Sequence, residues 1–175
     1  KPHLNINLFS YRLLHQGHEI IWWSERTGRG NYYLYDGNGR LKGRITQGDK
    51  LVAGRIEYLD LKKRRLVFIG YGDRQAYDPE YAYYYVVDLN GKRQQTLTYG
   101  NGTHELQFSE DHRFAIDSYS RMDMPTVYNV VDVDAPTKHF EFARCTDKDL
   151  KAAGWKAPVL IDVPAADGKT PLYGV

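Results

Sequence analysis

One strand–turn–strand pattern occurs twice in this chain, and the repeat limits the possible folds more than any other feature of the sequence. The stretch YLYDGNGRLKGRITQGD (33–49) returns as VVDLNGKRQQTLTYGNG (86–102). The residues that are identical in the two copies lie 52 positions apart: Asp36 and Asp88, Asn38 and Asn90, Gly39 and Gly91, Thr46 and Thr98, and Gly48 and Gly100. A fold built from one recurring small β-sheet is therefore expected.

A second recurring pattern sets the length of the unit. A polar turn stands before a short apolar strand in GHEIIWWSE (17–25), KRRLVFIGYGD (63–73) and DHRFAIDSYSR (111–121), at spacings of 46 and 48 residues. This period lies within the ~40–50 residues of a four-stranded propeller blade. The sequence therefore predicts an all-β fold, a partial β-propeller of three four-stranded antiparallel blades at about 4–49, 51–100 and 103–145.

The stretch YAYYYVVDL (81–89) favours stacked blades over one open sheet, because both of its alternating faces are apolar. A strand of this kind has to be covered on both sides, and neighbouring blades supply that cover. Gly37-Asn38-Gly39 and Asn90-Gly91 are expected to supply the positive φ angles of tight hairpin turns. Propellers close with about four to eight blades, so we expect further blades upstream or association with a second copy.

The pattern changes after Cys145. Thr146 and Asp149 resemble the start of a capping box, and Gly154 is expected to end a helix of about two turns. Pro158 and Pro164 then bracket a short strand that a turn joins to TPLYGV. We therefore expect a helical junction at 146–158 and, at 159–175, the first hairpin of a different, truncated domain.

Composition excludes several classes of function. The 175 residues carry 24 basic and 22 acidic side chains, a net charge of +2, which gives no electrostatic reason to expect a nucleic-acid partner. Apolar runs stay well short of the ~20 residues that span a bilayer, so no membrane span is predicted. The single cysteine, Cys145, rules out an internal disulfide. The triplet Asn101-Gly102-Thr103 fits the N-glycosylation pattern, but such triplets are frequent by chance.

Candidate chemical sites were weighed and set aside, so no catalytic, cofactor-binding or metal-binding residue and no cofactor is predicted. The serines lack the G-x-S-x-G elbow of a hydrolase nucleophile: Ser10, Ser24, Ser109, Ser118 and Ser120. His15 and His18 form H-x-x-H without a third ligand. Three motifs are interpreted as turns: Asp36-x-Asn38, Asp88-x-Asn90 and the P-loop-like Gly168–Thr170. Two loops at the propeller rim, 72–83 and 120–125, are expected to pack against neighbouring parts of the protein rather than to recognise a ligand. Trp22, Trp23 and Trp155 are expected in the core or at the junction.

The order of these parts resembles one known family. Tandem blades, a short helix, GWKAP (154–158), a strand and DGKTPLYGV (167–175) are similar to the dipeptidyl peptidase IV branch of the prolyl-oligopeptidase-type serine peptidases. SERTGRGNYYLYDGNGRLKGRITQGD (24–49) resembles a late-blade motif, and GTHELQFSEDHRFAIDSYSRMDMP (102–125) resembles the last blade. The resemblance covers essentially the whole chain. It implies that the last propeller blades run here into an α/β-hydrolase domain whose first hairpin is 159–175.

The resemblance also implies a function and its limits. The family's catalytic serine, aspartate and histidine and its paired N-terminus-binding glutamates have no match in this sequence, so none is carried over. We expect a non-catalytic propeller piece of a serine-type dipeptidyl peptidase, an aminopeptidase acting in proteolysis, that gates and helps position peptide substrates. Expected partners are those peptides, the missing blades and hydrolase domain, and a second copy in a homodimer. Family members in bacteria are mostly exported, which implies a periplasmic or secreted protein.

Two alternatives stay open at this stage. An exported, non-enzymatic propeller could bind protein, peptide or glycan, although the helix and final hairpin argue against it. A complete small β-domain would require its outer blade faces to be buried by self-association. Whether this chain belongs to an enzyme is therefore left undecided by the sequence.

Overall fold

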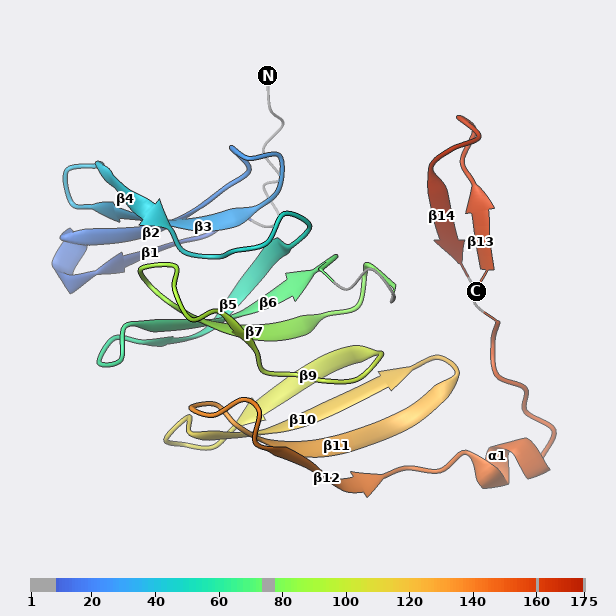
Figure 1. The fold of residues 1–175 in the computed structure, drawn as a ribbon. Helices are drawn as coiled ribbons and strands as arrows, with labels where there is room; N and C mark the ends of the chain where they lie inside the picture. The colour runs from blue at the N-terminus through green and yellow to red at the C-terminus, as the bar shows by residue number, and fades with distance from the viewer. Residues whose placement is uncertain (1–8, 74–77, 160, 175) are drawn as a thin grey trace.

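The computed structural model describes residues 9–73, 78–159 and 161–174. Three four-stranded antiparallel sheets are stacked on one another, and in each of them the strands lie in chain order (Figure 1). The first sheet contains β1 (Tyr11–Leu14), β2 (Glu19–Ser24), β3 (Asn31–Asp36) and β4 (Leu41–Arg44). The second contains β5 (Val52–Asp60), β6 (Arg65–Tyr71), β7 (Tyr83–Asp88) and β8 (Gln95–Thr96). The third contains β9 (Thr103–Phe108), β10 (Phe114–Arg121), β11 (Met124–Asp132) and β12 (His139–Arg144).

This arrangement confirms the predicted partial propeller of three four-stranded blades. A one-turn 3₁₀ helix, η1 (His15–Gly17), joins β1 to β2. The first predicted strand began at Leu4, and its residues before Phe9 lie outside the described part of the chain. The connections between strands lie at two opposite rims of the stack. The hairpin-side rim carries the β6–β7 and β10–β11 connections, and the opposite rim carries the β5–β6 and β9–β10 turns (Figure 1).

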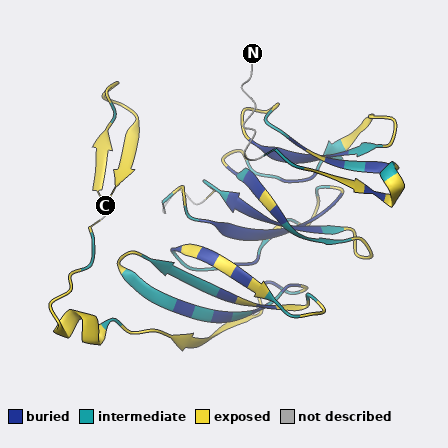
Figure 2. Cartoon of the chain, turned by 180° about the vertical axis from the view of Figure 1, so that it is seen from behind, coloured by how far each residue is buried: buried dark blue, intermediate teal, exposed yellow. Residues whose placement is uncertain are grey.

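Strand β7 lies between two separate hydrophobic cores. Tyr83, Tyr85 and Val87 pack with the buried residues of the first sheet, including Trp23 and Tyr32. The alternate residues of the same strand, Tyr84 and Val86, pack with the buried residues of the third sheet. All six residues of β7 are buried, as the dark blue middle sheet in Figure 2 shows. The two apolar faces expected for this stretch are thus each covered by a neighbouring blade.

The sequence repeat reproduces the same hydrogen bonds in the first two blades. The amide of Tyr32 donates to Thr46 Oγ1 at 3.0 Å, and 52 residues later the amide of Tyr84 donates to Thr98 Oγ1 at 3.0 Å. The residue before each threonine repeats a second bond: the amide of Ile45 donates to the carbonyl of Tyr32, and the amide of Leu97 donates to the carbonyl of Tyr84, each at 2.8 Å. The repeated threonines therefore attach the outermost segment of each blade to its third strand.

The hairpin turns confirm only part of the glycine prediction. Gly39 and Gly91 have positive φ angles of 81° and 79°. Gly37 does not share that conformation; a Cβ there would lie 2.7 Å from the carbonyl oxygen of Gly17, so close packing against the first turn excludes a side chain. Asn38 and Asn90 also stay outside the positive-φ region, and each asparagine occupies a turn that a side-chain carboxylate or amide oxygen stabilises.

Polar contacts join the first blade to the second at buried positions. The indole Nε1 of Trp23 donates to the carbonyl of Ala53 at 2.7 Å, and the hydroxyl of Tyr32 donates to the carbonyl of Gly54 at 2.8 Å. The side chain of Gln94 bridges both backbone groups of Gln47, accepting from its amide at 2.7 Å and donating to its carbonyl at 2.8 Å. These bonds fix the register between neighbouring sheets, which apolar packing alone does not specify.

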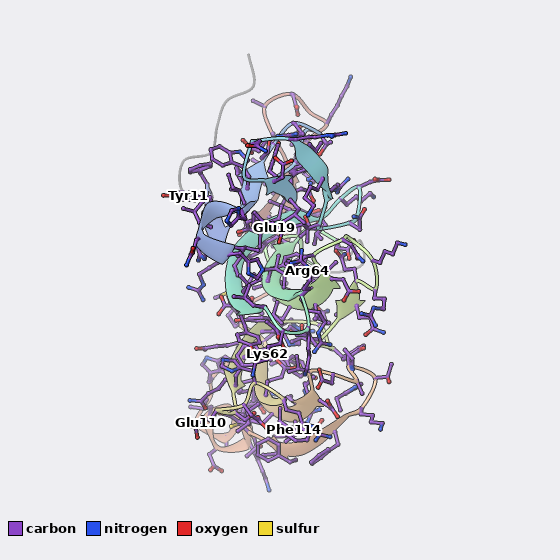
Figure 3. The ribbon with its side chains drawn as sticks, turned by 90° about the vertical axis from the view of Figure 1, so that its left-hand side faces the viewer. Tyr11, Glu19, Lys62, Arg64, Glu110 and Phe114 are labelled. Atoms are coloured by element: carbon purple, nitrogen blue, oxygen red, sulfur yellow. The ribbon has the colours of Figure 1, made fainter. Side chains whose placement is uncertain are left out.

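A cluster of one carboxylate and two basic side chains joins the same two blades at the opposite rim. Glu19 is nearly buried and accepts two hydrogen bonds from Arg64, at 2.8 and 3.1 Å, and one from Lys42 at 2.6 Å. Figure 3 views the stack from this rim and shows Glu19 and Arg64 facing each other between the sheets. The hydrogen bonds from Arg64 lower the pKa of Glu19 from 4.5 to about 2, against the opposing effect of burial.

Acid should therefore weaken this junction. Because the folded-state pKa of Glu19 lies below its unfolded value, the stabilisation is complete above about pH 5 and is lost as pH falls towards 2. We expect Glu19→Gln to lower the free energy of unfolding by about 1–3 kcal/mol at neutral pH and by nearly nothing at pH 2. Urea unfolding of both proteins across this pH range measures the difference; a difference that is constant with pH would contradict the assignment.

The end faces of the stack carry large apolar side chains that remain about 40–60% exposed. On the first sheet Tyr11, Leu13 and Trp22 are 51%, 61% and 40% exposed. On the third sheet the exposed apolar residues are Phe114, Ile116, Phe140 and Phe142. Trp22 therefore departs from its expected place in the core, whereas its neighbour Trp23 is fully buried.

The segment after the third sheet begins with α1 (Lys148–Ala152). The expected capping box is wrong in detail: Asp147 is the N-cap residue and makes no side-chain cap bond, while Thr146 Oγ1 accepts from the amide of Lys148 at 3.2 Å. The helix ends as predicted at Gly154, whose φ is 92°. The amides of Gly154 and Trp155 bond back to the carbonyls of Lys151 and Leu150, which is a Schellman motif.

The chain closes with a separate two-stranded sheet, β13 (Ile161–Pro164) and β14 (Pro171–Gly174), which stands beside the stack in Figure 1. Its strands are antiparallel, and every described residue in them is exposed. The helix and terminal hairpin predicted after Cys145 are thus both present. No helix in the described part of the chain has the length and apolar character needed to traverse a membrane.

Candidate functional site

A cavity with a volume of about 740 Å³ lies at the hairpin-side rim. One wall is formed by the segment 78–81, which precedes β7, and by Asn101 and Thr103 at the start of β9. The turn between β10 and β11 forms a second wall, at 120–123. Pro158 and the end of β14 close the cavity from the other side. The cavity therefore lies between the blades and the terminal hairpin.

Local sequence explains how these walls are placed. The β6–β7 connection, 72–82, is longer than an ordinary hairpin loop, so its last part reaches over the rim. Residues 74–77 of this predicted rim loop lie outside the described residues. Asp78 orders the part that lines the cavity, because its Oδ1 accepts from the amide of Glu80 at 2.9 Å and its carbonyl accepts from the amide of Tyr81 at 3.2 Å.

The second predicted rim loop, 120–125, is mostly strand rather than loop. Arg121 of β10 pairs directly with Met124 of β11, so only Met122 and Asp123 form the turn. Pro125, the last residue of the predicted loop, lies inside β11. The exposed Met122 projects from this short turn and lines the cavity.

An ion pair organises the charge of the cavity. Arg121 donates to both carboxylate oxygens of Asp123, at 2.7 and 3.1 Å, and to the carbonyl of Asn101 at 3.3 Å. The bond from Arg121 lowers the pKa of Asp123, and the same bond raises the pKa of Arg121. Burial raises the pKa of Tyr81, so this phenol is a neutral hydrogen-bonding group at physiological pH. The cavity offers paired charges, hydroxyl groups and apolar surface, which together suit contacts with a peptide.

The described residues do not assemble a nucleophilic centre. Each serine considered in the sequence makes ordinary structural contacts or none that involves a histidine; Ser10 lies 3.1 Å from the hydroxyl of Tyr32, and Ser109 closes the β9–β10 turn through the backbone of Phe114. His15 belongs to η1, and its Nε2 lies 3.9 Å from Glu19. No cluster of three or more metal-ligating side chains occurs within residues 9–73, 78–159 and 161–174.

The turn interpretations of the acidic motifs agree with the structure. Asp36 Oδ1 accepts from the amides of Asn38 and Arg40 at 3.0 and 2.9 Å. Asp88 binds the side chain of Arg93, and Asp167 accepts from the amides of Lys169 and Thr170 in the terminal hairpin. The hydrogen bond from the Thr170 hydroxyl and those two amides lower the pKa of Asp167 to about 2. These carboxylates accept hydrogen bonds from donors within their own turns.

Sequence reasoning missed one buried polar cluster. His104 Nδ1 lies 2.8 Å from Asp117 Oδ1, His104 Nε2 lies 3.2 Å from the carbonyl of Gly100, and Asn129 Nδ2 lies 3.4 Å from the second oxygen of Asp117. The His104 ring stacks on Tyr119 with a centroid distance of 4.7 Å. The cluster joins β9, β10 and β11 and contains no nucleophile, so its role is structural. One signal was available: Asp117 occupies an inward position in the alternating strand RFAIDSYS.

Comparison with known proteins decides the family. The profile described as "Dipeptidyl peptidase IV (DPP IV) N-terminal region" matches residues 2–126, most of the chain. The chain belongs to this family. The sequence-based resemblance to the dipeptidyl peptidase IV branch is thereby confirmed.

Solved structures show the same fold in much longer proteins. Dipeptidyl peptidase 4 of Porphyromonas gingivalis superposes with a TM-score of 0.67 at 20% identity, over 93% of this chain and 22% of that protein. A Bacteroides ovatus protein described as a dipeptidyl aminopeptidase IV gives a TM-score of 0.63 at 20% identity, over 89% and 24%. A prolyl endopeptidase gives 0.60 at 14% identity, over 94% and 24%. The chain thus spans about a quarter of the length of these three proteins.

Proposed function

We propose that this chain is the C-terminal arc of the propeller of a dipeptidyl-peptidase-IV-like serine exopeptidase, joined to the start of its α/β-hydrolase domain. The proposed parts are the blades at 1–145, the helical junction at 146–158 and the first hydrolase hairpin at 159–175. The observation that carries the proposal is the family match, together with structural likeness to peptidases over 93% of the chain. That likeness extends past the blades into the helix and hairpin region.

The proposed role of this part is to gate and position peptides rather than to react with them. The cavity between the blades and the hairpin supports this role, because it lies where a propeller and a following domain would face each other. Its neutral Tyr81 and its Arg121–Asp123 pair can donate and accept hydrogen bonds, and Asp78 and Glu80 add two carboxylates to the lining. The serine, histidine and aspartate of the reaction are proposed to lie in the hydrolase domain, in a periplasmic or secreted enzyme.

A non-enzymatic binding module is the alternative that the exposed apolar ends of the stack favour. Other blades or a second copy of the chain would then cover Phe114, Ile116 and the neighbouring side chains, and the cavity would hold a ligand without turnover. The gene downstream of Val175 separates the two readings. A G-x-S-x-G motif followed by an aspartate and a histidine supports the peptidase, and another blade supports the module.

Activity provides the direct test. We expect the 175-residue chain to release no product from an X-Pro chromogenic peptide, and the protein encoded by the whole gene to release it in a reaction that a serine-directed inhibitor abolishes. The physical reason is that the blades supply no activated nucleophile, and a hydroxyl without a base reacts too slowly to measure. Serine-dependent turnover by the 175-residue chain, or an inert product of the whole gene, would each reject the proposal.

A further inference from the structure

A second cavity, of about 340 Å³, lies at the opposite rim, between the first and second sheets. Its wall is strongly basic. The charged side chains that line it are Lys42, Lys63, Arg64, Arg93 and a single carboxylate, Asp88. This basic pocket shares no lining residue with the cavity beside the terminal hairpin; it is bounded by strands β3 and β4 and by the β5–β6 and β7–β8 turns.

The basic wall is held in place from behind. Glu19 binds Lys42 and Arg64, and Asp134 of the third sheet binds Lys63 at 2.7 Å. Neither of these two carboxylates lines the pocket. The cations are thus oriented by partners on the protein side, while roughly half of each Lys42, Lys63 and Arg64 side chain stays open to solvent. A site whose donors are already fixed loses less entropy when it binds a ligand.

Turn geometry fixes the backbone of two of these cations, as it fixes that of His112 in the β9–β10 turn, which lies outside the pocket. Arg64 and Arg93 adopt positive φ angles of 50° and 54°, a region that suits glycine or asparagine and is strained for a long side chain. Both arginines line the same pocket.

Arg93 is the pocket residue whose substitution best distinguishes a binding role of these cations from a structural role. The contact of Arg64 with Glu19 joins two blades, so that arginine has a structural reason to be present. Arg93 is 77% exposed, and it contacts Asp88 of its own turn through Nε at 2.7 Å. Its terminal nitrogens have no hydrogen-bond partner among the described residues and remain available to a ligand. A guanidinium presents such donors in the planar geometry that matches phosphate oxygens.

We propose that this basic pocket binds a small phosphate-type oxyanion between the first two blades. Several charged donors around a cavity of this size fit a compact ligand with two or more negative charges and tetrahedral oxygen atoms. A monovalent carboxylate would leave most of these donors unused. Binding joins Lys42 of the first blade to Arg64 and Arg93 of the second, so the ligand stabilises the contact between the two blades.

Calorimetric titration of the full chain with pyrophosphate, at constant ionic strength, tests the proposal. We expect saturable one-site binding, and a rise in the unfolding temperature as pyrophosphate is added. Arg93→Asn should weaken binding by about tenfold, since it removes a charge-assisted contact. The same substitution should change the unfolding temperature of the ligand-free protein only slightly, because the tolerance of asparagine for the positive φ offsets the loss of the ion pair with Asp88.

Lys62→Met is the matched control, because Lys62 is an exposed residue of the same β5–β6 turn that does not line the pocket. It removes the same charge and should change the affinity by less than about twofold, as expected of a solvent-exposed charge. Equal weakening by both variants would mean diffuse surface attraction and would overturn the site. So would the absence of saturable binding, or an Arg93→Asn protein that is destabilised while its affinity is unchanged.

Discussion

Asp117→Ala should lower the free energy of unfolding by about 2–5 kcal/mol, the largest effect expected of any single polar substitution in the blades. The carboxylate is 1% exposed and faces His104 Nδ1 at 2.8 Å and Asn129 Nδ2 at 3.4 Å. Its removal leaves His104 Nδ1 and Asn129 Nδ2 buried without this acceptor. Urea unfolding followed by fluorescence measures the loss.

Asp123→Ala is the matched control for this prediction. Asp123 also pairs with a cation, Arg121, but its side chain is 46% exposed, so the same substitution should cost less than about 1 kcal/mol. The double variant His104→Ala/Asp117→Ala should lose clearly less stability than the two single losses added together, because the groups act on each other. If Asp117→Ala and Asp123→Ala cost the same, the buried cluster does not stabilise the third blade.

Trp23→Ala should cost about 3–5 kcal/mol, because it empties the centre of the contact between the first two blades. The indole is fully buried, and its Nε1 donates to the carbonyl of Ala53 in the next blade at 2.7 Å. Packing around it is tight: a Cβ at Gly30 would lie 2.0 Å from the indole ring. The surrounding strands therefore have little freedom to fill the space, and a buried carbonyl loses its donor.

The neighbouring residue provides an internal comparison. Trp22→Ala changes the same residue type one position away in β2. The Trp22 side chain is 40% exposed, so this substitution should lower the free energy of unfolding by only about 1 kcal/mol. Chemical unfolding of both variants, read by circular dichroism, gives the two values. Similar losses for Trp22 and Trp23 would contradict the assignment of Trp23 to the seam between blades.

Much of the fold was predictable because it depends on local periodicity. The alternating apolar residues of YAYYYVVDL predict a strand covered on both faces, and the repeated Asp-x-Asn-Gly turns locate the β3–β4 and β7–β8 connections. Contacts between blades were not predictable in the same way. The bridge from Gln94 to Gln47 spans 47 residues, and no spacing rule relates a side-chain amide to a distant backbone group.

The sites were less predictable than the fold for a similar reason. The basic pocket draws Lys42 from one blade and Arg64 and Arg93 from the next, so its members are scattered in the sequence and meet only after the sheets stack. The sequence predicted Asp88 as a turn residue, and nothing in it marked Arg93, because a positive φ at arginine follows from the turn geometry rather than from residue preference. The charge of the pocket becomes visible only when burial and contacts are known.

The position of β7 between two cores has a consequence for how the stack comes apart. Each blade contacts only its neighbours, so stability resembles that of a linear array with nearest-neighbour coupling. An end blade can detach when one of the two hydrophobic cores is lost, whereas opening the middle blade disrupts both cores at once. Thermal opening should therefore begin at the ends of the array and reach the tyrosine-rich centre last, which makes that centre the most persistent part of the molecule.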